Sequence, residues 1–146
     1  MRRGQVATEF LVIIVLVLVV FIPLLVFVYF KTNEANAQIG QYQAELAALR
    51  LAYLANSVGA LGSNTSIIAE VYIPPGVLGF STQSVGHGGE VVLTVQTPSG
   101  PSDIVEIVNY PIEYPNPSLQ TQQGWADFNI TSVYVNGVAE IDIERS

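Results

Sequence analysis

The sequence has no cysteine, and its five lysine and arginine residues stand against twelve acidic ones. Without cysteine the chain forms no disulfide bond and has no thiolate chemistry. Its formal net charge of −7 makes the surface repel nucleic acid and anionic lipid headgroups, so we expect neither as a partner. The lack of cysteine does not fix the compartment, because many extracellular proteins also lack disulfides.

Patterns that usually mark an enzyme are also missing. The one histidine, His87, lies among glycines in the segment 86–89, which is typical of an exposed turn, and no further metal ligands accompany it. Because no Lys-Ser/Thr follows these glycines, they do not form a phosphate loop. No spacing specifies an acid/base pair among Asp103, Glu106 and Glu113. We therefore predict a protein that is not an enzyme and has no cofactor and no metal.

The sequence does contain one long apolar run, from Phe10 to Phe30. The run carries no charge and, as a helix, is long enough to cross a hydrocarbon layer of ~30 Å. It is too long for a cleaved secretory signal, and no small-residue cleavage site follows it. Glu9 stands immediately before the run, where a carboxylate is costly in lipid unless a partner neutralises it. The partner of Glu9 is therefore the central functional question.

The residues that lead into the run read Arg2-Arg3-Gly4-Gln5-Val6-Ala7-Thr8-Glu9-Phe10. This order resembles an archaeal type IV pilin with a class III signal peptide. In that family a prepilin peptidase cuts before the apolar segment, and the helix stays in the mature subunit. The resemblance implies a leader of residues 1–4 and a cleavage site formed by Arg3, Gly4 and Gln5. The family often has serine where Ala7 stands, so the sequence departs from the pattern there.

Cleavage after Gly4 would create an α-amine on Gln5, near the head of an apolar helix. In a stack of such helices, the Glu9 carboxylate of one subunit would accept the amine of a neighbour, so that two isolated charges become one pair. Because such a pair would fix the axial position of neighbouring helices, we assign Gln5, Glu9 and Phe10 to assembly and axial register. The Gln-x-x-x-Glu-Phe entry resembles the pilin group more than archaellins. If Gln5 cyclises to pyroglutamate, the amine is lost and Glu9 would pair with N–H groups at its own helix N-terminus.

One helix is predicted from about Val6 to Val58, with Gly59 or Gly62 as its stop. Within the helical region 5–62, residues 10–30 form an apolar half and residues 31–58 an amphipathic half. Pro23 predicts a bend or a loosened turn in the apolar half. The amphipathic half shows two apolar stripes, one of Ile39, Tyr42, Leu46, Leu49 and Tyr53, and one of Leu51, Leu54, Val58 and Leu61. We expect the protein's own head domain to cover one stripe and neighbouring subunits the other.

Residues 63–146 predict a β-rich globular head. Strands are expected at 67–73, 77–80, 90–97, 103–109, 127–135 and 138–144. The strands 90–97 and 103–109 have apolar residues on both faces, so we expect both to be central. The clearest signal is the Asn136-Gly137 turn, which is typical of a two-residue hairpin and pairs Val135 with Val138. The fold class is therefore α+β, a long N-terminal helix packed against a small antiparallel, sandwich-like head.

Two further features of the head suggest surface chemistry. Asn64 and Asn129 each begin an N-x-[ST] sequon, the acceptor pattern for N-glycosylation. Tyr110, Tyr114 and Trp125 border a proline-rich loop, where aromatic rings either stack on sugars or serve core and subunit contacts.

The resemblance implies a structural subunit of an extracellular, archaeal type IV pilus-like filament on the cell surface, with helices bundled in the filament core and β heads outside. Its partners would be copies of itself, the prepilin peptidase and the pilus assembly machinery, and the membrane would hold the precursor. The alternative is a single-span, membrane-anchored surface or adhesion domain that binds a glycan and does not polymerise. A minor, filament-priming pilin is a third hypothesis.

Overall fold

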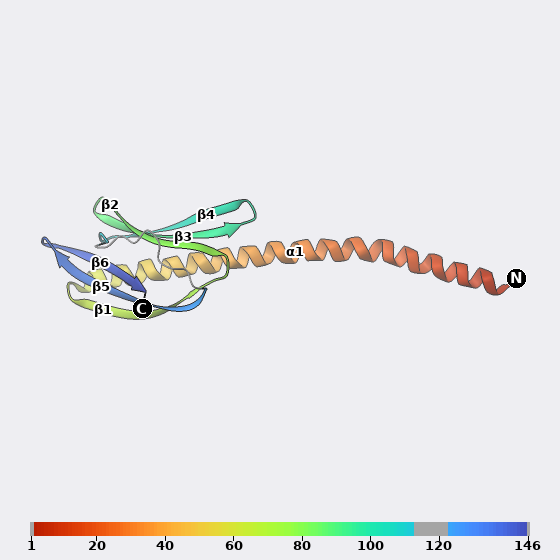
Figure 1. Cartoon of the computed structure of the whole chain (residues 1–146), viewed down its shortest axis with the longest axis horizontal. Helices are drawn as coiled ribbons and strands as arrows, with labels where there is room; N and C mark the ends of the chain where they lie inside the picture. Colours follow the sequence, from red (N-terminus) through yellow and green to blue (C-terminus); the bar gives the residue numbers. More distant parts are fainter. Residues whose placement is uncertain (1, 113–122, 146) are drawn as a thin grey trace. The chain divides into compact units, whose positions relative to one another are not determined.

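The computed structural model describes residues 2–112 and 123–145, with side chains described from Val6 onward. One helix precedes the strands along the chain (Figure 1). The elements are α1 (Arg2–Leu61), β1 (Thr65–Ile73), β2 (Val77–Val85), β3 (Gly88–Thr97), β4 (Gly100–Val108), β5 (Gly124–Val135) and β6 (Val138–Arg145). This confirms the predicted α+β fold. The chain forms two compact units, residues 1–37 and 38–146, and α1 contributes to both.

The first unit consists of the apolar half of α1. Its side chains from Phe10 to Phe30, apart from Pro23, are all large, apolar and exposed. The helix continues through Pro23, so the predicted loosened turn is absent. Proline removes one backbone donor, and the rest of the helical hydrogen-bond ladder remains to hold the segment together. The ribbon of this half curves gently without a break (Figure 1).

The helix ends at Leu61, and Gly62 is the stop. Gly62 has a φ of 97°, the left-handed conformation in which glycine commonly ends helices. Its N–H donates to the Gly59 carbonyl at 3.3 Å. Two residues later, the Asn64 N–H donates to the Ser132 carbonyl at 2.8 Å, which ties the start of the head to β5. The stop at Gly62 is one of the two that the sequence predicted, and the observed helix extends beyond the predicted span of about Val6 to Val58 at both ends.

The strands form two antiparallel three-stranded sheets, in the orders β1-β5-β6 and β2-β3-β4. The prediction of a central strand was right for β3 and wrong for β4, which is an edge strand. Apolar residues lie on both faces of β4, but Val105 and Ile107 on the outward face are exposed. Strand β2 is longer than predicted, because it continues to the tight turn at Gly86 and His87, where Val85 pairs with Gly88.

The β5–β6 hairpin has the predicted register. Val135 pairs with Val138, and both turn residues, Asn136 and Gly137, have positive φ values of 52° and 88°. A type I′ turn requires this combination. From this turn the register places the pair Ile130 and Ile143 on the buried face.

One hydrophobic core joins both sheets to the second half of α1. The two sheets lie on two sides of this half of the helix (Figure 1). Phe80 of β2 and Phe128 of β5 meet edge to face, with ring centroids 5.6 Å apart, and so connect the sheets. The helix contributes a face of mostly small residues, which lets both sheets approach its backbone closely: Ala44, Ala47, Ala48, Leu51, Ala52, Ala55 and Val58.

The segment after β4 ties the sheets and the helix together. The Asn109 N–H donates to Asn56 Oδ1 on α1 at 2.7 Å. Tyr110 then packs against Gly59 of the helix, and the Pro111 carbonyl accepts the Ile141 N–H of β6 at 2.8 Å. A few residues of chain therefore connect α1, the end of β4 and the β6 edge.

A first prediction concerns the contact of Tyr110 with Gly59. A Cβ at position 59 would overlap the tyrosine ring, whereas at Gly40 the nearest atom would be the Pro75 carbonyl oxygen at 3.6 Å. We expect Gly59→Ala to lower the free energy of unfolding by about 1–3 kcal/mol through overpacking. Gly40→Ala is the matched control and should raise it by up to about 1 kcal/mol through helix propensity. Denaturant unfolding of the detergent-solubilised chain, followed by circular dichroism, measures both. Equal effects of the two substitutions would contradict the proposed overlap.

A second prediction concerns Ser132, whose side chain is 0% exposed. Among the described residues, its Oγ is buried without a hydrogen-bond partner. Because an unpaired buried hydroxyl is destabilising, we expect Ser132→Ala to raise the free energy of unfolding by about 1 kcal/mol. Ser66→Ala serves as the control, since the Ser66 hydroxyl donates to Asn129 Oδ1 at 2.7 Å, and its loss should not stabilise the head. A destabilised Ser132→Ala variant would show that the hydroxyl has a favourable contact after all.

Candidate functional site

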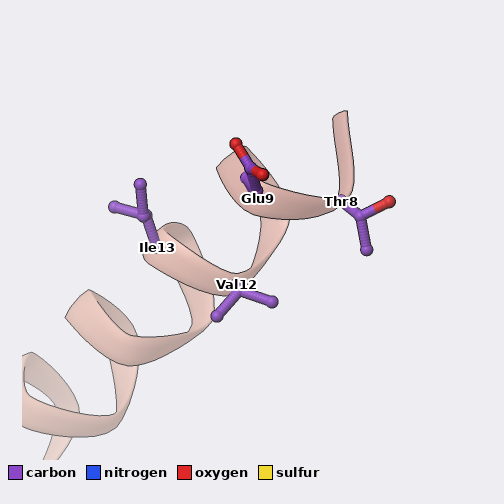
Figure 2. A pocket seen from close by; sticks show the side chains of 4 residues that line it. All are labelled: Thr8, Glu9, Val12 and Ile13. Carbon is purple, nitrogen blue, oxygen red and sulfur yellow. The ribbon is translucent and has the colours of Figure 1, made fainter. Parts of the chain in front are cut away.

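The N-terminal site predicted from the sequence lies in the first unit. Figure 2 shows Glu9 near the end of α1, with its carboxylate directed away from the helix and Ile13 one turn further along. Glu9 and Phe10 are both exposed, and Thr8, Glu9, Val12 and Ile13 line an open hollow on the helix surface. No ion pair joins Glu9 to another described side chain. The side chains of Arg3 and Gln5 lie outside the described part of the structure.

The apolar run ends at a local charge pair. Lys31 Nζ lies 2.7 Å from Glu34 Oε2, one turn further along the helix, and both side chains are exposed. By length and composition, α1 is able to cross a membrane. The apolar half therefore suits a membrane anchor, with the Lys31–Glu34 pair just past its end.

The second half of α1 carries an exposed apolar stripe, which we call the outer stripe. Its side chains are between 46% and 69% exposed, and they are Ile39, Tyr42, Leu46, Leu49 and Tyr53. At about 3.6 residues per turn, these positions lie on the helix face opposite the alanine-rich face in the core. The other predicted stripe is buried by the head at Leu51 and Val58, as expected. The prediction of a covered stripe is wrong at Leu61, which is the last residue of the helix and is exposed.

A small groove lies on the flank between the outer stripe and the β1-β5-β6 sheet. Its volume is about 180 Å³, and it is lined by Gln43, Leu46, Ala47, Arg50, Val71, Tyr72 and Trp125. The rings of Tyr72 and Trp125, opposite each other on β1 and β5, have centroids 5.3 Å apart. We call this site the Trp125 groove. Sequence reasoning singled out Trp125 but missed Tyr72 and Arg50, because β1–β5 pairing and helix packing bring them together across long stretches of chain.

The aromatic residues near the proline-rich loop have different surroundings. Trp125 is 63% exposed, so it is not a core residue. Tyr110 is partly buried and packs against the core, which agrees with the predicted core contact rather than with sugar stacking. Tyr114 lies outside the described residues.

The two sequons lie beside each other on the β1–β5 ladder. Asn64 is exposed in the turn before β1, with a φ of 64°. Asn129 lies within β5 and is only partly exposed, which is less than the hairpin register alone suggested. The Ser66 hydroxyl, which belongs to the first sequon, donates to Asn129 Oδ1 of the second. A glycan would be attached to Nδ2 of Asn129, and Oδ1 would still be able to accept this hydrogen bond.

The scattered acidic residues do not converge. Asp103 accepts a hydrogen bond from the Thr94 hydroxyl at 2.6 Å, and Glu106, three residues along the same strand, lies on the opposite face. Glu113 lies outside the described residues. His87 is exposed in the β2–β3 turn, as its glycine surroundings predicted. Within residues 2–112 and 123–145, no group of three or more His, Asp or Glu side chains is arranged to hold a metal.

Three features of the surface are the exposed Glu9 before the apolar run, the exposed outer stripe, and the Trp125 groove beside the stripe. Comparisons of the chain with protein-family models, with curated proteins and with solved structures each find no match.

Proposed function

We propose that this protein is a non-enzymatic structural subunit of an extracellular type IV pilus-like filament, in which copies of the chain pack through α1 and the β-rich heads face outward. The outer stripe carries this proposal. Large apolar side chains facing water mark interaction surfaces when they form a continuous patch, whereas single exposed ones are ordinary. The outer stripe is such a patch, and it covers several turns of one helix face.

The position of the outer stripe separates a filament subunit from a monomeric tether. In a tethered monomer, the uncharged run from Phe10 to Phe30 matches the thickness of the hydrocarbon layer. The stripe begins at Ile39, after Lys31 and a polar stretch, so lipid does not cover it if the run spans the membrane. The described part of the head does not cover it either, because it packs on the opposite helix face. We therefore assign the covering of the outer stripe to another copy of this chain, because the helices of identical copies present matching apolar faces.

Glu9 supports the same proposal from the other end of the helix. In the proposed mature subunit, cleavage between Gly4 and Gln5 frees an α-amine close to the apolar run. The exposed Glu9 carboxylate has no cationic partner among the described side chains, so a neighbouring subunit's amine is free to pair with it. Such a pair would fix the axial register of neighbouring helices and allow the acid to leave water. Pairing would take place as the subunit leaves the membrane and joins the filament.

The alternative is a membrane-anchored surface domain that binds a glycan and does not polymerise. The exposed rings of Tyr72 and Trp125 favour it, because exposed aromatic faces beside polar side chains suit sugar stacking. Mass spectrometry of the mature N-terminus separates the two proposals: removal of residues 1–4 supports the filament subunit, and an intact Met1 supports the tether.

A third prediction tests the outer stripe. Replacing Tyr42 and Leu49 together by glutamine removes two exposed apolar side chains without touching the core. We expect the double variant to fold and insert as the wild type does but to give at least about tenfold fewer filaments, because interface anchors often contribute more than ~1 kcal/mol each. Electron microscopy of the cell surface measures the yield. Glu45→Gln, an exposed change off the stripe, is the control. A normal filament yield from the double variant would remove the main support for the proposal.

A fourth prediction concerns the acid before the apolar run. Glu9→Ala should leave the precursor stable in the membrane, because removing an isolated charge there costs nothing, and it should abolish or strongly reduce filament assembly. Glu9→Gln keeps the side-chain shape and should assemble poorly too if the charge matters. Quantitative immunoblotting follows the precursor, and electron microscopy follows the filaments. Wild-type filament yield from both variants would show that the carboxylate has no role in pairing.

A further inference from the structure

The Trp125 groove combines features of a contact hot spot. Trp, Tyr and Arg are the residues most enriched among side chains that dominate binding energies, and the groove brings one of each together with Leu46. Trp125 lies on β5, the central strand of its sheet, and its ring contacts the ring of Tyr72 on β1, with centroids 5.3 Å apart. A rigid aromatic side chain gives up little conformational entropy on binding.

The size of the groove limits its occupant. Its volume of about 180 Å³ is below the ~300–1,000 Å³ typical of small-molecule pockets. One or two side chains of another protein chain fill such a space. The groove also shares Leu46 with the outer stripe, so a copy that covers the stripe also reaches the edge of the groove.

Charge indicates which chain fits. The uncleaved chain has a formal net charge of −7, and removal of Arg2 and Arg3 with the leader makes it −9 (−7 − 2). Copies of like charge repel one another, so a contact between a cation of one copy and an acid of the other favours association. Arg50 is an exposed cation at the groove, and no ion pair to it exists among the described side chains. A second copy carries acidic side chains on the exposed faces of its strands, including Glu70 and Asp127, which lie opposite each other on β1 and β5.

We propose that the Trp125 groove is a head-level docking site for a second copy of this chain, which places an acidic side chain against Arg50 and apolar atoms against Trp125 and Tyr72. This inference rests on the proposed filament and adds a contact between heads to the contacts between helices. In this arrangement the head also sets the register, because a cation at the groove in an acidic surface favours positions of the neighbour that bring an acid to it.

The test uses Trp125 as a natural reporter, because it is the one tryptophan in the sequence. In the detergent-solubilised full chain, its fluorescence should be readily quenched by acrylamide. In assembled filaments, quenching should fall several-fold and the emission should move to shorter wavelength. Filaments in which Trp125 stays as quenchable as in single subunits would overturn the inference while leaving the proposed function intact. A wild-type chain that never assembles would overturn both.

Two variants and a cross-linker identify the occupant. Arg50→Glu should raise the concentration needed for assembly at least about tenfold, whereas Arg50→Lys should retain most assembly, because the charge is kept. Tyr134→Ala, which removes an exposed ring away from the groove, is the control and should assemble normally.

A photo-reactive phenylalanine derivative in place of Trp125 should give a chain–chain adduct of twice the subunit mass. An adduct with carbohydrate or with a different protein would overturn the inference.

Discussion

The structure depends on a difference in side-chain size between the two faces of one helix. Along the second half of α1, small residues turn toward the sheets and large apolar residues turn away from them. The small face allows two three-stranded sheets to close around the helix, so a modest head acquires a dense core. The large face is left in water. The same helix therefore completes a folded domain and leaves an apolar surface that the domain does not cover.

This difference between the faces is consistent with the sheets contacting one face of the second half of α1 and leaving the other exposed. Each sheet has three strands, and its inner face is filled by contacts with alanines and with the other sheet through Phe80 and Phe128. The strands that remain at the edges present their outward faces to water, as Val105 and Ile107 of β4 do. Covering the outer stripe from within the chain would take further strands, and the structure has none in its described part. Association with another copy, as proposed above, would remove that surface from water.

The two proposals place different demands on the chain. A tether needs an apolar span and a head. A filament subunit also needs surfaces that meet in a fixed register. In the proposed filament, the outer stripe would supply area, Glu9 a charge at one end of the helix, and the Trp125 groove an aromatic and cationic contact at the head. Apolar area by itself sets position only loosely, because sliding along a uniform apolar surface changes little energy. Charges and shaped grooves set the register.

The sequence by itself determined the long helix, its stop at glycine, the α+β class and the β5–β6 hairpin. These features follow from local chemistry: an uncharged run of 21 residues has the length of a membrane-spanning helix, and Asn-Gly allows the positive φ values of a tight turn. The central position of β4 was predicted wrongly, because a strand with apolar residues on both faces does not say which face another layer will cover. Only the tertiary structure decided which helix stripe is buried, since alanines and leucines compete for the same core and close packing favoured the smaller side chains. It also assembled the Trp125 groove from α1, β1 and β5, a grouping that depends on long-range strand pairing and leaves no local signal in the chain.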